Sequence, residues 1–254
     1  MRARREGTCQ VMATVRVAQI LSEVTTGPHW GVGPLQRLVS ACARAFPVTG
    51  VGLLLMNDTG PAGMLAVTDG SAAILEELQF NLGEGPGVDS ARTGRPVLTP
   101  DLARTGPQRW PGFSAGALES GICAVFAFPL RVGDIRVGVL ELHRDQVGIL
   151  STDELAEALS FADAATAVLL HLQARSWPDG VADLGSIPVI EDRAEVHQAT
   201  GMISVQAEVT LAQALMLLRG RAFADDRPIL FLSRDVLAGV VFFTSDVEGG
   251  IHGY

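Results

Sequence analysis

The 254-residue chain contains no lysine, and all 19 of its basic residues are arginine. A phosphate-binding loop, the ATP-binding strand of a protein kinase and a Schiff-base enzyme each depend on a lysine, so the sequence excludes these three classes of site. The absence also argues against a phosphate-accepting receiver domain, which needs a lysine beside its aspartate. An arginine-only chain most simply reflects a GC-rich genome and not an adaptation to phosphate.

Cysteine and histidine are scarce too. Cys9, Cys42 and Cys123 are odd in number and widely spaced, which predicts neither a disulfide framework nor a zinc site. The five histidines stand apart without ligand spacing, and none belongs to a nucleophile motif. Asp101 and Glu119 do not form a recognisable carboxylate pair. We therefore expect no enzymatic activity, no catalytic residues, no bound metal and no cofactor.

Long apolar runs are missing as well. The longest lies near residues 122–130 and is far too short to span a bilayer, and no apolar signal region follows the basic start MRARRE. Apolar residues make up 48% of the chain and charged residues 19%, which favours a folded core with disorder only at the ends. We expect a cytoplasmic protein without membrane contact, organised as one large domain or two smaller ones.

Apolar periodicity predicts alternating helices and strands over residues 11–174, after a flexible basic head at 1–10. Ser151 and Glu154 have the spacing of a capping box that begins the last of these helices. The strands within 122–142 are apolar on both faces, so the sheet that they form needs a cover on each side. The expected elements are helices 11–24, 35–46, 72–80, 114–120 and 152–174, and strands 50–56, 64–69, 122–130 and 135–142.

Residues 82–97, LGEGPGVDSARTGRPV, are the most distinctive stretch of this half. Their glycines suggest a dinucleotide-binding loop, but the third glycine is missing from the required place and the stretch follows a helix instead of a strand. We therefore predict a tight loop that leads into a short helix beginning near Val88 or Asp89.

The C-terminal quarter has a different pattern. We expect a linker at residues 175–190, three short helices within 191–243 and a loose tail at 244–254. Thr210 and Gln213 have the spacing of a capping box at the start of the second helix. Amphipathic helices of this length form a small bundle or an arm docked on a larger unit. The three apolar stripes are Val196, Ala199, Ile203 and Ala207; Leu211, Leu215, Leu218 and Ala222; and Leu232, Val236 and Val240.

Several segments of the chain resemble those of a known protein family. The segments VHQATGMISVQ and LAQALMLLRGRAFADDRPI, with the residues around DVLAG, closely resemble the ANTAR domain, a three-helix RNA-binding module of bacterial transcription antiterminators. The segments LGEGPGVDSARTGRPV, DLARTGPQRWPGFSAGALESGICAVFAFPLRVGDIRVGVLELHR and GILSTDELAEALSFADAATAVLL closely resemble the GAF halves of actinobacterial GAF–ANTAR proteins. The resemblance covers nearly the whole chain.

The resemblance implies an α+β fold in two parts. A GAF sensor domain, with an antiparallel sheet covered by helices, would span residues 11–174, and a three-helix ANTAR domain would span 191–243. Many relatives have a cysteine after GEGP, where this chain has Gly87, so a cysteine-based redox or adduct role is not implied here. The motif that marks cyclic-nucleotide-binding relatives includes a lysine, so this chain cannot carry it intact.

The function that the resemblance implies is regulatory. A homodimer would hold nascent RNA with two paired stem-loops, favour that RNA fold over a terminator hairpin, and let polymerase continue. An unidentified small molecule or partner of the GAF domain would gate this binding. Specific RNA recognition reads splayed loop bases, while arginines neutralise phosphates. The RNA-binding candidates are Ala199 and Gly201 for close approach, Gln198 and Thr200 for base contacts, and Arg193, Arg219, Arg221 and Arg227 for phosphate contacts.

Other interpretations of the same residues stay open. Each arginine is also consistent with a solvated helix face, and Gly201 with close packing of two helices. Residues 191–243 hold five arginines against seven acidic residues, which is a poor electrostatic footprint for RNA. The alternative function is therefore a small-molecule sensor whose C-terminal helices act through protein contacts or as a dimerisation tail, with RNA binding weak or lost.

Overall fold

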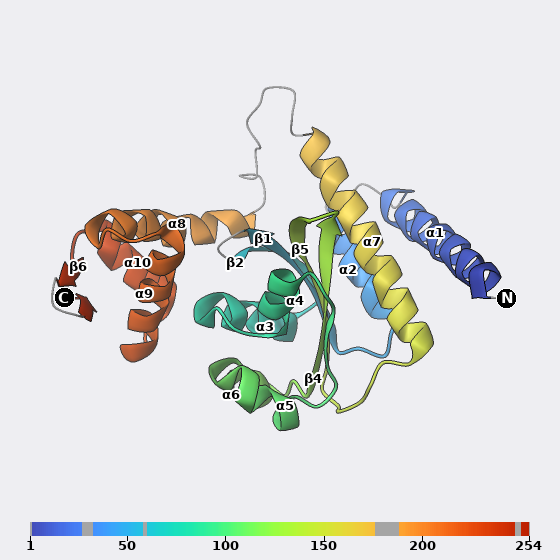
Figure 1. Ribbon diagram of the computed structural model, residues 1–254, viewed down its shortest axis with the longest axis horizontal. Coiled ribbons are helices and arrows are strands. Elements are labelled where there is room, and N and C mark those ends of the chain that lie inside the picture. The colour runs from blue at the N-terminus through green and yellow to red at the C-terminus, as the bar shows by residue number, and fades with distance from the viewer. Residues whose placement is uncertain (1, 27–32, 58–59, 176–187, 247–249, 254) are drawn as a thin grey trace.

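The architecture comes from a computed structural model that describes most of the chain. The expected linker lies mainly outside the described residues, at positions 176–187. Figure 1 shows a sheet with helices on both faces and, beside it, a group of C-terminal helices. The α+β fold class predicted from the sequence is confirmed. The described residues are 2–26, 33–57, 60–175, 188–246 and 250–253.

Five strands of the described chain form one antiparallel sheet in the order β2-β1-β5-β4-β3. The predicted hairpin is confirmed: β4 and β5 pair up to Val132 and Ile135, and the turn passes through Gly133 with a left-handed φ of 59°. β2 tolerates Pro61 because it pairs on one side only. The strands are β1 (Gly50–Asn57), β2 (Gly60–Val67), β3 (Val97–Thr99), β4 (Ala124–Val132) and β5 (Ile135–Arg144).

One face of the sheet is covered by α1 (Arg2–Thr26), α2 (Pro34–Ala45) and α7 (Thr152–Arg175), the helices at the right of Figure 1. The core between these helices and the sheet is apolar throughout and contains Phe126, Phe128, Leu140, Leu142 and Phe161. The predicted capping box begins α7: the N–H of Glu154 donates to Ser151 Oγ, and the N–H of Ser151 donates to Glu154 Oε2.

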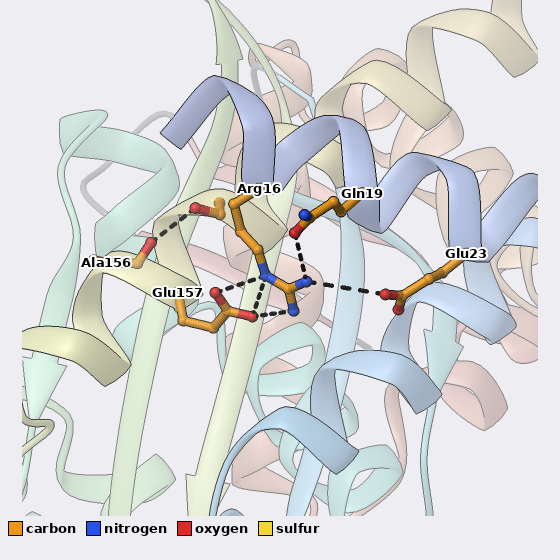
Figure 2. Close-up of polar contacts among 6 residues, drawn as sticks. Arg16, Gln19, Glu23, Ala156 and Glu157 are labelled. Carbon is orange, nitrogen blue, oxygen red and sulfur yellow. Dashed lines mark hydrogen bonds and ion pairs between the residues drawn. The ribbon is translucent and has the colours of Figure 1, made fainter. Parts of the chain in front are cut away.

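An arginine–carboxylate pair fastens α1 to α7 at the rim of this core (Figure 2). Arg16 Nε donates to both carboxylate oxygens of Glu157, at 2.8 and 3.0 Å, and its guanidinium carbon lies 5.9 Å from the centre of the Phe161 ring. The helix begins at Arg2, so residues 2–10 do not form the flexible head that we expected. The reason is that Arg, Ala, Glu and Gln favour helix, and no proline interrupts the segment.

The opposite face of the sheet is covered by four shorter helices: α3 (Gly70–Leu82), α4 (Pro86–Thr93), α5 (Leu102–Arg109) and α6 (Pro111–Glu119). Their core includes Leu54, Leu75, Trp110, Phe113 and Val125. The sheet therefore has an apolar cover on each side, as the two apolar faces of its strands predict. The loop after α3 is also confirmed, although α4 begins at Pro86, two residues before the predicted start.

Three further helices follow within residues 188–246, namely α8 (Pro188–Gln206), α9 (Leu211–Ala224) and α10 (Ile229–Leu237). Most residues of the predicted stripes meet in one core, but Leu211 and Val240 are exposed, and Val240 lies beyond the end of α10. The capping box of Thr210 and Gln213 is present. The tail is ordered in part, because β6 (Phe243–Asp246) pairs with β7 (Gly250–Gly253). This corrects the expected loose tail: the apolar ring of Phe243 is buried among these helices, and its N–H donates to Gln206.

One described helix, over Thr152–Leu172, is long and apolar enough to cross a membrane by length and composition. A second candidate arises only if α8 and α9, bent by 108°, are taken together. The apolar side of α7 already packs against the sheet through Ala158, Ala162 and Val168. The core therefore accounts for the buried side of this helix, whereas Leu159 and Leu170 are exposed.

Candidate functional site

Helix α3 carries the buried polar side chains of the second sheet face. Asp69 caps its first turn by accepting the N–H of Ala72 at 2.9 Å, and Gly83 ends it in the left-handed region at φ 68°. Gln79 and Phe80 lie three and four residues after Glu76, about one helical turn further along α3. Glu76 and Gln79 are completely buried, although α3 lies in an otherwise apolar layer.

Two buried carboxylates and one amide form a cluster between α3, α4 and β5. Gln79 Nε2 donates to Glu141 Oε2 at 2.6 Å, while Gln79 Oε1 accepts the N–H of Gly87 at 2.7 Å. Glu76 and Glu141 are both 0% exposed. Among the described residues, no hydrogen-bond partner is found for either oxygen of Glu76 or for Glu141 Oε1. Buried polar groups without partners are rare, so the cluster is a candidate for function.

The cluster favours a bound proton. Burial and then the charge of Glu141 raise the pKa of Glu76 well above its ordinary value, and the guanidinium of Arg193 opposes this rise. Burial raises the pKa of Glu141 to about 7, and hydrogen bonds, first that of Gln79, offset part of the rise. Two adjacent carboxylates without solvent cannot both be ionised easily. The pair can therefore hold or exchange a proton, or receive a cationic or donor-rich group.

Glycines make room for these carboxylates. A Cβ atom at Gly87 would lie 2.5 Å from Glu141 Oε1 and 2.9 Å from Gln79 Oε1. A Cβ atom at Gly52 of β1 would overlap the carboxylate of Glu76. A residue larger than glycine at position 87 would therefore have to displace the ends of these two buried side chains.

His143 extends the polar row along β5, two residues after Glu141 and on the same face. Its Nε2 lies 2.9 Å from Ser71 Oγ, and the side chain is buried. Burial lowers the pKa of His143, against the influence of Asp69 and Asp145. Among the described residues, no group of three or more His, Cys, Asp or Glu side chains is arranged to hold a metal ion.

Sequence reasoning missed Glu76, Gln79 and Glu141. A signal was available, because Glu141 interrupts the apolar strand between Leu140 and Leu142. A charged residue that faces a covered side of a sheet must be buried, and a buried charge calls for an explanation.

Two of the predicted phosphate contacts, Arg193 and Arg219, face helix α3 instead of solvent. The guanidinium carbon of Arg193, on α8, lies 3.9 Å from the centre of the Phe80 ring. Arg219, on α9, lies 5.8 Å from the same ring centre, and its Nε donates to the Phe80 carbonyl at 2.9 Å. A cleft of about 550 Å³ opens beside Arg219, and its lining includes Asn81, Phe223 and Arg227.

The other RNA-binding candidates do not form one exposed surface. Ala199 is a correction: it is fully buried because it belongs to the core stripe of α8. Thr200 is also buried, and its hydroxyl donates to the Val196 carbonyl at 2.7 Å. Gln198 is exposed, and Gly201 is half-buried. A Cβ atom at Gly201 would meet nothing within 4 Å, so close helix packing does not explain this glycine.

The two remaining arginines are partly exposed and face acidic residues of their own unit. Arg221 Nε donates to Asp225 at 2.7 Å, and Arg227 Nη2 donates to Asp235 at 2.6 Å. The structure therefore brings Arg193 and Arg219 together on Phe80, and Arg227 lines the same cleft as Arg219. Asp101, which the sequence left without a catalytic role, caps α5 by accepting the N–H of Arg104.

Similarity to known proteins is found for the part of the chain that forms the five-stranded sheet and its covering helices. A profile described as the GAF domain matches residues 35–170. A comparison with curated proteins finds no match. The chain is similar in structure to the GAF domain of a phosphoenolpyruvate-protein phosphotransferase from Coxiella burnetii, with 18% identity, a TM-score of 0.48, and coverage of 65% of this chain and 96% of that chain.

Two further similar structures have comparable coverage. The GAF domain of an Acinetobacter phosphoenolpyruvate-protein phosphotransferase has 14% identity and a TM-score of 0.49, covering 65% of this chain and 97% of that chain. A type II free methionine-R-sulfoxide reductase from Thermoplasma acidophilum has 16% identity and a TM-score of 0.43, covering 54% of this chain and 90% of that chain.

Proposed function

Because the chain belongs to the GAF domain family, we propose that residues 35–170 sense a signal and that helices α8–α10 respond by binding folded RNA. GAF domains are typically sensors of small molecules or proteins. The RNA-binding part follows the resemblance of the C-terminal segments to the ANTAR domain. In this proposal the protein is a cytoplasmic transcription antiterminator that stabilises paired stem-loops in a nascent transcript.

One observation carries the proposal for the output. The segments that resemble the ANTAR domain form α8, α9 and α10, and their apolar stripes meet in a core of their own. Gln198 is exposed on this unit, and Gly201 has open space above its Cα atom. An RNA backbone can approach such a position closely. Arg221 and Arg227 are partly exposed, so phosphates can compete with Asp225 and Asp235 for them.

The buried carboxylate pair is the proposed point of signal input. Glu76 and Glu141 lie between the sheet and α3, and three of their four carboxylate oxygens, all but Glu141 Oε2, lack hydrogen-bond partners among the described residues. A small molecule with a positive charge or several hydrogen-bond donors would supply those partners. Its entry would displace α3 or α4, since the carboxylates already fill the space above Gly52 and Gly87.

A homodimer belongs to the same proposal. Val15 on α1 and Leu159 and Leu170 on α7 are exposed apolar residues on the two helices that Arg16 and Glu157 join. Sedimentation of the full chain as a single monomeric species would exclude this part of the proposal.

RNA binding is tested with the full chain and a fluorescent RNA that carries two small stem-loops. Four phosphate contacts predict a slope of roughly −3 when the logarithm of affinity is plotted against the logarithm of salt concentration. An RNA of equal length with unpaired, scrambled sequence is the matched control and should bind more weakly. Equal binding of the two RNAs, or no binding at low salt, would contradict the proposed output.

A second function is favoured by the exposed apolar residues of α9 and α10. Met216, Phe223 and Phe231 are 66%, 72% and 53% exposed, and such side chains commonly mark protein contacts. In this alternative the helices bind a partner protein instead of RNA. Replacing Met216 and Phe223 together by serine should then abolish partner binding while any RNA affinity stays unchanged.

A further inference from the structure

Phe80 links the sensor to the C-terminal helices. It belongs to α3, yet its ring is 4% exposed and lies in the apolar core formed by α8, α9 and α10. Its backbone carbonyl accepts the hydrogen bond from Arg219 Nε at 2.9 Å. One residue of the sensor therefore contributes both apolar surface and a hydrogen-bond acceptor to the other unit.

Two guanidinium groups share the Phe80 ring. Arg193 comes from α8 and Arg219 from α9, and their guanidinium carbons lie 3.9 and 5.8 Å from the ring centre. Gly83, at the end of α3, lets Arg219 approach, because a Cβ atom there would lie 2.7 Å from Arg219 Nη1. Cation–π contacts of this kind are attractive and tolerate small changes in geometry.

Within the part of the chain that the structure describes, the contact with Phe80 leaves the guanidinium group of Arg219 without a negative partner and with one nitrogen unpaired. Burial, and then the nearby charge of Arg193, lower the pKa of Arg219 to about 10. Arg219 Nη2 is buried without a hydrogen-bond partner, and none of the ion pairs among the described residues involves Arg219. A phosphate oxygen would supply the missing negative charge and acceptor. The arginine is therefore held by the sensor but would be better satisfied by a phosphate.

Helix α3 connects this contact to the buried carboxylates. Gln79 precedes Phe80 directly and is hydrogen-bonded to Glu141 of β5 and Gly87 of α4. Glu76 lies one turn before Phe80 and is electrostatically coupled to Arg193. A displacement of α3 by a ligand at the carboxylates would therefore move the Phe80 ring.

We propose that Phe80 is an autoinhibitory latch: the sensor and RNA compete for the guanidinium groups of Arg193 and Arg219. While α3 holds both arginines, the C-terminal helices cannot offer them to phosphate. Movement of α3 releases the two arginines together. This inference rests on the proposed RNA-binding function and adds the contact through which that function is controlled.

The test measures the arginines directly as well as RNA affinity. Phenylglyoxal modifies accessible arginines, and mass spectrometry of peptides gives the rate at each position. Arg92 and Arg104, whose side chains are 73% and 75% exposed, are internal references. The variants are Phe80→Ala, Phe80→Leu, which retains apolar packing without the aromatic ring, and the control Ile74→Ala, an exposed residue of the same helix.

The latch predicts slow labelling of Arg193 and Arg219 in the native chain. If the latch is open about a tenth of the time, phenylglyoxal should label Arg193 and Arg219 about tenfold faster in both Phe80 variants than in the native chain. The affinity of both variants for the stem-loop RNA should rise by about the same factor. Ile74→Ala should change neither quantity. Circular dichroism checks that each variant is folded, and Phe80→Leu keeps the test valid if Phe80→Ala unfolds.

Arginine labelling and RNA affinity together distinguish a failure of the latch from a failure of the proposed RNA-binding function. Labelling of Arg193 and Arg219 that is unchanged in Phe80→Leu overturns the latch, whatever the RNA does. RNA binding that is equal in the native chain and the folded Phe80 variants overturns the latch and leaves the proposed function standing. Faster labelling with no RNA binding by any variant overturns the competition together with the proposed function.

Discussion

The two faces of the sheet differ in what they bury, although the same strands form both. Along β5, Leu140 and Leu142 face an apolar core under α1, α2 and α7, whereas Glu141 and His143 face α3 and α4. The first face is an ordinary core that stabilises the fold. The second buries carboxylates that cost stability, and α3 connects it to the C-terminal helices. We therefore assign the maintenance of structure to the first face and the proposed signalling to the second.

The largest expected effect is a loss of stability from the apolar face. Phe128→Ala removes a fully buried ring and should lower the free energy of unfolding by about 3–5 kcal/mol in denaturant titrations. Ile135→Ala, at an exposed position of the adjoining strand, is the matched control. A Phe128 variant no less stable than the Ile135 variant would remove the distinction between core and surface on which the comparison depends.

The polar face should make stability depend on pH. The pKa of Glu141 is raised to about 7, so the folded chain keeps a proton that the unfolded chain releases above about pH 4. Stability is therefore complete below that pH and is lost as the pH rises through 7. The loss should be on the order of 3 kcal/mol.

His143 acts in the opposite direction, because its pKa is lowered by burial and its contribution is lost on acidification. The charged groups near the carboxylate pair are Arg193 and, along β5, His143. The effect of the carboxylates is isolated by comparing the native chain with Glu141→Gln, which should flatten the fall in stability between pH 5 and 8. An unchanged pH profile in that variant would show that Glu141 does not titrate in this range.

A smaller effect is expected from crowding the polar face. Gly87→Ala places a methyl group against Glu141 and Gln79 and should lower the free energy of unfolding by about 1–3 kcal/mol. Gly220→Ala, where a Cβ atom meets nothing within 4 Å on a helix, should instead stabilise by up to about 1 kcal/mol. Thermal unfolding shows whether each substitution raises or lowers stability. A stabilised Gly87 variant would mean that the cluster accommodates a methyl group beside Glu141 and Gln79 without strain.

The smallest effect concerns the rim of the apolar face. Arg16→Ala breaks the pair with Glu157 shown in Figure 2, but both side chains are partly exposed, so the loss should stay below about 1 kcal/mol. A double-mutant cycle with Glu157→Ala measures the coupling. A coupling of several kcal/mol would place this pair among the main determinants of the fold, contrary to the comparison.

Local patterns predicted most of the fold. The apolar alternation of β4 and β5, the capping boxes at Ser151 and Thr210, and the stripes of α8–α10 depend on neighbouring residues. The structure contains them, except that Leu211 and Val240 are exposed. β3 has only three residues, and α5 contains Pro107, so their patterns were too short or too irregular to predict.

The candidate site was harder to predict because it is formed by distant segments. Glu76 and Glu141 are far apart in the sequence. Glu76 looks like an ordinary surface charge when read alone, and the apolar strand around Glu141 indicates its burial but not its partners. Arg193 and Arg219 fit a solvated helix face equally well in the sequence, but Phe80, more than a hundred residues earlier, contacts both. Only the folded chain shows that both arginines and Glu141 contact α3, the helix that carries Glu76.

The most direct test of this coupling is the affinity of the full chain for the stem-loop RNA at pH 6 and pH 8, in the native protein and in Glu76→Gln. Ionisation of the carboxylate pair beside Arg193 should hold that arginine more firmly. The native chain should therefore bind RNA more weakly at pH 8, while Glu76→Gln should show little change. Equal pH dependence in the two proteins would contradict the claim that the polar face of the sensor controls the C-terminal helices.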